Sequence, residues 1–148
     1  MIRGVVIVGT LLLGVGVVAA QQDLVAQRSA LMKANGKNLG TVLSATAKGD
    51  KPYDQAAIDA ALNVLDDSAK KMGALYVDST KGLKAEGDFQ PSPKIWENKA
   101  GFDAEVAAFG KAVTEAKAKI KDLDSLKATL PTIGKQCGSC HEGFRLKS

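Results

Sequence analysis

The pentapeptide Cys137-Gly138-Ser139-Cys140-His141, close to the C-terminus, constrains the chain most strongly. It contains both cysteines and the one histidine of the sequence. A C-x-x-C-H run is typical of covalent haem attachment, because each thiol adds across one haem vinyl group while the adjoining imidazole reaches the iron. In a helix these three side chains project from neighbouring positions of one face, which suits a single porphyrin lying against that helix.

Three other kinds of site compete with haem for this motif. A zinc site needs a fourth ligand, usually from a second Cys or His pair, and the chain has no further cysteine or histidine. A thioredoxin-like dithiol is expected after a strand in a βαβ unit, and the sequence shows no such pattern. A structural disulfide would close a very short loop of little stabilising value and leave the histidine unexplained. We therefore expect one covalently bound haem c.

The N-terminal stretch predicts export. Arg3 gives a short positive start, an apolar run follows, and small residues precede a cleavage point before Gln21. An uncleaved membrane anchor is the alternative, but about 15 apolar residues interrupted by glycines are short for a bilayer span of roughly 20. We expect residues 1–20 to be a secretory signal peptide and residues 21–148 to be one domain in the periplasm, where bacteria attach c-type haem.

Apolar residues recur at helical spacing in four segments separated by turn residues. The expected helices cover residues 23–48, 54–76, 92–120 and 122–144. Asp23, Asp54 and Ser92 are the expected N-caps, and Pro131 should bend the last helix. No strand pattern occurs, so the fold class is all-α and the architecture a four-helix bundle.

Two further features place the expected haem in this bundle. Cys137 and Cys140 fall in register with the apolar seam of the last helix, so the haem should be inserted in the bundle core. The connection formed by residues 78–91 is long for a compact domain, and it should wrap the bundle or border the cofactor.

Four stretches then identify a known family: Arg28 to Met32, Pro93 to Trp96, Ala100 to Phe102, and Cys137 to Arg145. With them the mature chain resembles the class II c-type cytochromes, which comprise cytochrome c-prime and low-spin relatives of the cytochrome c-556 type. The resemblance implies an antiparallel four-helix bundle with haem in its interior. It also implies that Cys137 and Cys140 form the thioethers and that His141 is the proximal iron ligand.

The distal side of the iron stays open at this point. Family members divide between a five-coordinate high-spin state and a six-coordinate low-spin state with a methionine from the first helix. Met32 matches that position, and the alternative is that it only fills the core. By the same resemblance Arg28 meets a haem propionate, the alternative being a solvated arginine, and Trp96 and Phe102 line the haem.

The expected function is that of a periplasmic monohaem electron carrier with low-spin iron. The alternatives are a high-spin cytochrome c-prime that binds nitric oxide or carbon monoxide, and an exported helical bundle with a disulfide. The sequence has no second histidine and no nucleophile–histidine–acid set, so we expect no enzyme. A net charge of +4 without a basic run gives no argument for nucleic acid. Redox proteins are the expected partners, without membrane contact after signal cleavage, and the family often forms homodimers.

Overall fold

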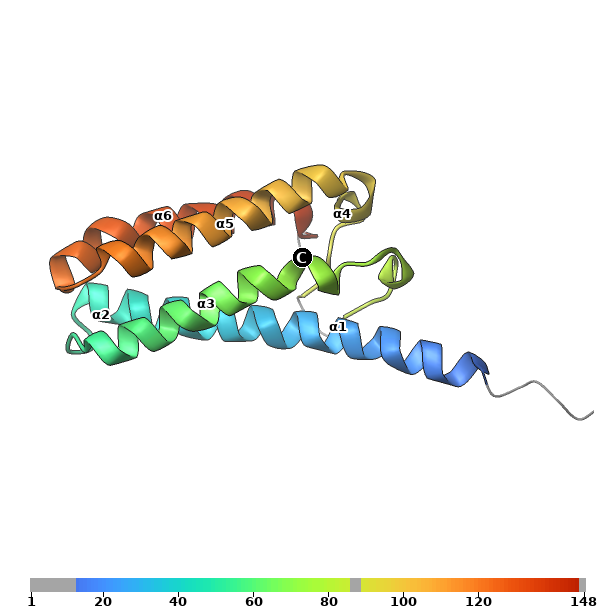
Figure 1. Ribbon diagram of the computed structural model, residues 1–148, viewed down its shortest axis with the longest axis horizontal. Coiled ribbons are helices and arrows are strands. Elements are labelled where there is room, and N and C mark those ends of the chain that lie inside the picture. Colours follow the sequence, from blue (N-terminus) through green and yellow to red (C-terminus); the bar gives the residue numbers. More distant parts are fainter. Residues whose placement is uncertain (1–12, 86–88, 147–148) are drawn as a thin grey trace, which may run out of the picture.

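A computed structural model describes residues 13–85 and 89–146, and four long helices form an antiparallel bundle within these ranges (Figure 1). The helices are α1 (Leu13–Lys37), α3 (Gln55–Leu75), α5 (Lys99–Lys119) and α6 (Leu123–Phe144). The described residues contain no strand, only an isolated bridge between Pro91 and Arg145. The predicted all-α bundle is therefore confirmed.

The first helix is longer than expected and changes type along its length. After α1 the chain continues without a break through a π-helical stretch, η1 (Asn38–Ser44), into α2 (Ala45–Lys48). Gly49 then ends it in the left-handed conformation, with φ of 87°. The prediction that Asp23 is the N-cap is wrong, because α1 already begins at Leu13, and the alanines and glutamines before Asp23 are good helix formers that continue the helix in that direction.

The second long helix begins where the sequence predicted. The side chain of Asp54 accepts hydrogen bonds from the backbone N–H groups of Ala56 at 2.9 Å and Ala57 at 3.4 Å. These bonds satisfy donors that have no partner inside the helix. Asp54 is therefore confirmed as the N-cap of α3.

The third predicted helix is divided in two. Ser92 precedes a single turn, α4 (Lys94–Glu97), and the chain breaks at Asn98 before α5 begins. Asn98 caps α5, because its side-chain oxygen accepts from the backbone N–H of Gly101 at 3.1 Å. Asparagine favours such caps over helix interiors, which explains the break.

The last helix starts with a reciprocal cap and runs through its proline. The Asp122 carboxylate accepts from the Ser125 backbone N–H at 2.7 Å, and the Ser125 hydroxyl oxygen accepts from the Asp122 N–H at 3.0 Å. The helix then continues past Pro131 to Phe144. The prediction of one helix rather than two is confirmed.

The core is closely packed at one end of the bundle, which we call the solid end. This end lies near α2 and the α5–α6 turn, which Figure 1 shows side by side. Its side chains come from η1, α3, α6 and α5 with its C-cap residue, and have 0 or 1% of their surface exposed: Leu43, Ile58, Leu62, Leu65, Val113, Ala116, Ile120, Leu126 and Ile133. Helix α6 packs here against α5, η1 and α2. The opposite end, near α4, contains a cavity, and we call it the cavity end.

The long α3–α4 connection lies across the C-terminal end of α6. The backbone N–H of Ser92 donates to the carbonyl of Phe144 at 2.9 Å, and that of Leu146 donates to the carbonyl of Gln90 at 3.1 Å. These two bonds tie the residues after α6 to the connection, so the connection closes one side of the cavity end.

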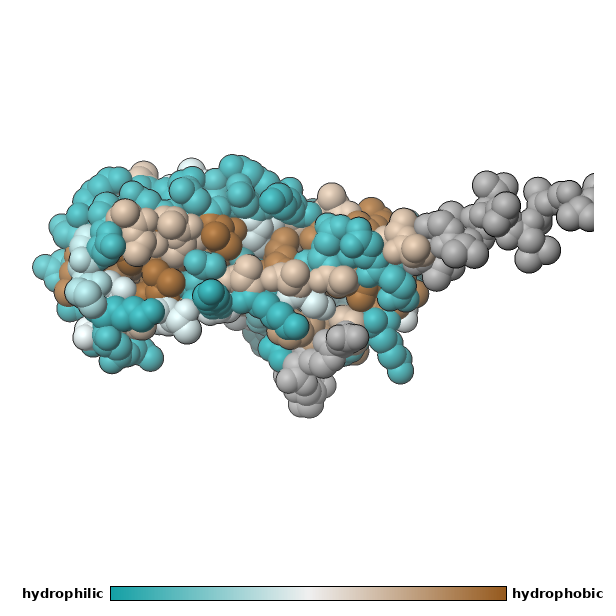
Figure 2. All heavy atoms as spheres, turned by 90° about the horizontal axis from the view of Figure 1, so that it is seen from below, coloured by the Kyte–Doolittle hydropathy of each residue, from teal (hydrophilic) through white to brown (hydrophobic). Residues whose placement is uncertain are grey.

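The surface is mixed. Figure 2, which looks onto the α1–α3 side, shows hydrophobic side chains between hydrophilic ones. Among the described residues the large hydrophobic side chains with the greatest exposure are Val64, Val77 and Leu146, at 36, 40 and 46%. The apolar stripes of the helices therefore face mainly inward, as the sequence pattern predicted.

Candidate haem-binding site

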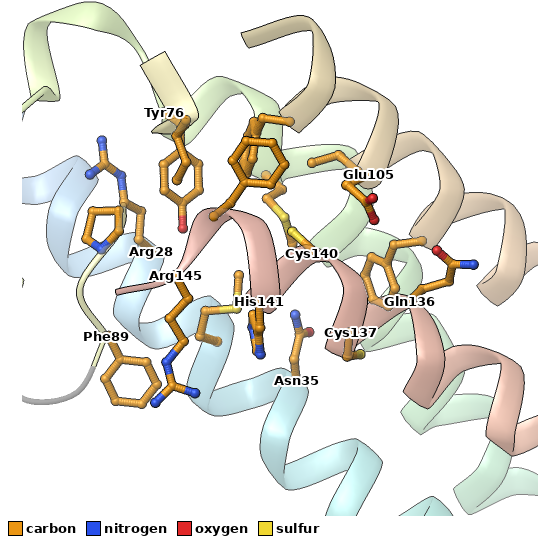
Figure 3. A pocket seen from close by; sticks show the side chains of 18 of the residues that line it. Arg28, Asn35, Tyr76, Phe89, Glu105, Gln136, Cys137, Cys140, His141 and Arg145 are labelled. Atoms are coloured by element: carbon orange, nitrogen blue, oxygen red, sulfur yellow. The ribbon is translucent and has the colours of Figure 1, made fainter. Parts of the chain in front are cut away.

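The cavity end contains a cavity of about 380 Å³, within the range of roughly 300–1,000 Å³ that is usual for small-molecule sites. Figure 3 shows side chains that enter it from several helices. Its walls come from α1, α3, α5 and α6 together with residues 89–91 of the α3–α4 connection. This connection therefore borders the cavity.

Helix α6 presents the C-x-x-C-H motif to the cavity. Cys137, Cys140 and His141 all line it (Figure 3), and both cysteines are free thiols. The two cysteines are half-buried and pack against the apolar core. Burial raises the pKa of Cys137. Burial, followed by the negative charge of Glu105 and the neighbouring Cys137, raises the pKa of Cys140 to about 11.

The His141 imidazole is exposed on the open side of the cavity. Its pKa lies below the ordinary value, first because the protein partly desolvates it and second because the Arg145 guanidinium is near. Both effects favour the neutral imidazole, which is the form of histidine that binds metal ions.

Helix α1 provides another wall with Met32, Asn35 and Gly36, and Leu39 of η1 continues this wall. Met32 is half-buried and packs against the core. A Cβ atom built on Gly36 would meet no other atom within 4 Å. The backbone of α1 is thus open to the cavity one turn after Met32, and a flat group can approach it closely.

Arg28 is the most deeply buried cation at the cavity, with 3% of its surface exposed. Its Nε donates to the Leu75 carbonyl at 2.6 Å, and its Nη2 donates to the Thr80 hydroxyl. The guanidinium also lies 4.4 Å from the ring centre of Tyr76 and 5.5 Å from that of Trp96. Burial lowers the pKa of Arg28, and among the described residues no carboxylate forms an ion pair with it.

The two aromatic residues expected to line the haem take different places. Phe102 lines the cavity and packs edge-on against Tyr76 and Phe144, with ring centres 4.9 and 5.6 Å apart. Trp96 is not among the lining residues. Its indole N–H donates to the Val77 carbonyl at 3.1 Å, and its ring supports Arg28.

Several lining residues were not among the candidates from the sequence, among them Asn35, Met72 and Glu105. Met72 lies on the predicted apolar stripe of α3, and Glu105 lies between Phe102 and Phe109 at steps of three and four along α5. That spacing places Glu105 on the inner face of α5, so the helical period could have found it. A polar residue at an inner position is the signal.

The residues of the cavity fit a haem. Three buried side-chain atoms in the described part of the chain have no hydrogen-bond partner, namely Arg28 Nη1, Asn35 Oδ1 and Glu105 Oε2. All three residues line this cavity. Buried polar groups normally find partners, so these atoms mark a place where a bound group with polar substituents is needed. Two thiols, an imidazole, a buried cation and an apolar wall suit a porphyrin with propionates.

Comparison with known proteins agrees with this geometry. The family model for cytochrome C' matches residues 23–145. A cytochrome c-556 from Rhodopseudomonas palustris is 55% identical over 99% of both chains. The chain belongs to the cytochrome C' family.

Other relatives include both branches of this family. A cytochrome c' from Rhodopseudomonas palustris is 40% identical, over 99% of this chain and 97% of its own. An NMR-validated structure of oxidised cytochrome c556 from R. palustris superimposes with a TM-score of 0.76 at 56% identity, covering 86% of this chain and 98% of that chain. The cytochrome c' structure from the same organism gives a TM-score of 0.76 at 39% identity, covering 85% of this chain and 98% of that chain.

Family membership confirms two predictions from the sequence, the class II c-type cytochrome family and covalently attached haem c as its cofactor. Proteins of this family are periplasmic and act as electron carriers or gas-binding haem proteins. No helix in the described ranges is long and apolar enough to cross a membrane. The predicted signal peptide lies partly outside these ranges, since α1 begins at Leu13.

Proposed function

We propose that the protein is a periplasmic electron carrier with one haem c, in which His141 and Met32 would be the iron ligands. The observation that supports this best is that both residues line one cavity while coming from different helices, α6 and α1. A histidine–methionine pair keeps the iron six-coordinate and raises its reduction potential, which suits electron transfer rather than ligand binding.

In this proposal α6 holds the haem through Cys137 and Cys140, whose thiols form the two thioethers. Haem supplies the one-electron chemistry of its iron. The neutral His141 imidazole is directed toward the cavity because it lies four residues after Cys137, on about the same face of α6. The remaining apolar wall, including Phe102, excludes water from the site.

Arg28 is the proposed contact for a haem propionate. A buried cation without an anionic partner is costly, and Nη1 of Arg28 donates to no partner in the part of the chain that the structure describes. The hydrogen bonds to Leu75 and Thr80 hold the guanidinium in place. Trp96 supports it from the side through its ring. Trp96 would then act through Arg28 rather than by touching the haem.

We further propose that residues 1–20 are a signal peptide and that residues 21–148 act in the periplasm by exchanging electrons with redox proteins. The periplasmic setting agrees with the family. We also propose that two copies of the bundle can pair as a homodimer, on the precedent of the family resemblance.

The optical spectrum of the purified protein tests the state of the iron. A six-coordinate iron should give a low-spin spectrum in both oxidation states, and the reduced protein should react little with carbon monoxide. A high-spin spectrum with ready carbon monoxide binding would instead support a gas-binding cytochrome c'. Cytochrome c prime variants from Alcaligenes xylosoxidans whose structures contain nitric oxide are 28 to 29% identical to this chain.

Two matched variants identify the sixth ligand. Met32→Ala should convert the protein to high spin and lower its reduction potential, because the thioether is lost. Met72→Leu removes the other methionine that lines the cavity and should leave the low-spin spectrum unchanged. Conversion by Met72→Leu, or a low-spin Met32→Ala protein, would contradict the assignment to Met32.

A further inference from the structure

Glu105 differs from the other α5 residues at the cavity. The α5 positions around it that line the same cavity are apolar: Phe102, Val106 and Phe109. One of its carboxylate oxygens, Oε1, accepts from the Ser139 hydroxyl at 3.0 Å. The other, Oε2, is buried and has no hydrogen-bond partner in the described part of the chain. None of the ion pairs formed by the described residues includes Glu105.

The position of Glu105 relative to the motif is specific. Its partner Ser139 lies between the two cysteines, and Figure 3 shows the carboxylate directed toward α6 beside Cys140. Glu105 and Cys140 also line the same cavity. A group attached at the Cys140 sulfur therefore lies in the electric field of this carboxylate.

We propose that Glu105 tunes the reduction potential of the haem by placing a negative charge beside its attachment site on α6. The inference rests on the proposed function in one respect, the attachment of haem at Cys137 and Cys140. Reduction adds one electron from a partner protein to the iron and forms or breaks no bond. A nearby negative charge favours the oxidised iron, which carries one more positive charge, and therefore lowers the potential.

Other charged or titratable groups also line the cavity, and a substitution of Glu105 leaves them unchanged. They are Arg28 from α1, Tyr76 from α3, the motif residues and Arg145 from α6 and its end. The cavity-lining residue of α4, Ile95, is apolar. Arg28 and Arg145 are cations and act in the opposite direction to Glu105. The potential thus reflects the balance between one carboxylate and two guanidinium groups.

The reduction potential of the haem-loaded protein tests the proposal. Glu105→Gln keeps the shape and an oxygen that accepts from Ser139, but removes the charge. We expect the potential to rise, with a change of about tenfold in the Fe(II) to Fe(III) ratio at a fixed solution potential, or about 59 mV for one electron. Glu115→Gln is the control on the same helix, since Glu115 is exposed and pairs with Lys119 at 3.5 Å. It should leave the potential unchanged.

Two more variants separate charge from structure. Glu105→Asp retains the charge and should keep the potential near that of the wild type. Ser139→Ala removes the hydrogen bond but not the charge, and should not raise the potential. An unchanged potential in Glu105→Gln, or an equal rise in Ser139→Ala, overturns the proposal. The haem mass and spectrum of each variant show whether haem is attached, so a failure of the proposed function is recognised separately from a failure of this inference.

Discussion

The solid end and the cavity end are built from the same four helices, yet different interactions fill them. At the solid end side chains such as Leu62, Val113 and Ile133 have no exposed surface, so apolar contact alone completes the core. At the cavity end the wall contains an arginine, a glutamate and an asparagine, each with one buried polar atom that has no hydrogen-bond partner among the described residues. The core of the solid end is thus complete in the protein alone, whereas the core of the cavity end needs a bound group to complete it.

This difference predicts which property a substitution affects. Substitutions at the solid end should change the free energy of unfolding and leave the haem spectrum unchanged. Substitutions at the cavity end should change haem attachment, the spin state of the iron or its reduction potential. Four changes test this division, in order of decreasing effect.

The largest effect is expected for the double variant Cys137→Ser, Cys140→Ser. A hydroxyl does not form the thioether, so covalent haem should be lost completely. Mass spectrometry of the denatured, exported protein measures this, because covalent haem adds its own mass. Ser139→Ala, at the exposed position between the two cysteines, should retain the full haem mass. Haem mass in the double variant would show that attachment uses other residues.

Leu62→Ala should cost the solid end about 2–5 kcal/mol of unfolding free energy, because it removes a fully buried side chain and leaves a cavity. Denaturant unfolding of the haem-loaded protein measures this cost. The matched control is Val64→Ala on the same helix, which is 36% exposed and should change stability by roughly 0.5 kcal/mol or less. A shifted haem spectrum in Leu62→Ala would show that the two ends are not independent.

Arg28→Met should change both the free energy of unfolding and the reduction potential, since Arg28 lines the cavity and also binds the α3–α4 connection through Thr80. It leaves the Leu75 carbonyl and the Thr80 hydroxyl without their donor, at an expected cost of about 1–3 kcal/mol. The loss of a cation should also lower the reduction potential. Arg145→Met, at an exposed position, should cost less stability. Equal losses in both variants would argue against the special place of Arg28.

The smallest effect concerns Asp66, which joins α3 to α5 on the surface. Hydrogen bonds from Lys70 at 2.7 Å and Lys117 at 3.0 Å hold the pKa of this carboxyl below its ordinary value of 3.8. Its stabilising contribution is therefore present above that value and lost as the pH falls through the lower folded pKa. Asp66→Asn should be slightly less stable than the wild type at neutral pH, and the gap should close in acid and shrink in high salt. A gap that widens in acid would contradict this.

Much of the fold could be predicted because local signals decided it. Asp54 ends a stretch of turn residues and caps α3, and the spacing of apolar residues defined the inner face of each helix. The predicted start of the first helix was wrong. Asp23 can cap a helix only if the residues before it are not helical, and here the helix already begins at Leu13. The π-helical stretch η1 has no residue signature, since it depends on which carbonyl each N–H selects.

The residues of the candidate site that are neighbours in the sequence could be predicted. The contacts between residues of different helices were harder to predict. The motif from Cys137 to His141 is local, so its residues could be named directly. The support of Arg28 by Trp96 joins α1 to α4, and the bond between Glu105 and Ser139 joins α5 to α6. Such pairs become visible only when the helices are assembled.

The backbone bonds of Ser92 and Leu146 have a consequence for protein fusions. Each bond joins residues more than fifty positions apart in the sequence, and together they hold the residues after α6 beside residues 90–92. Gln90 and Pro91 line the cavity. A label joined to the chain shortly after Leu146 would therefore begin beside the proposed haem site.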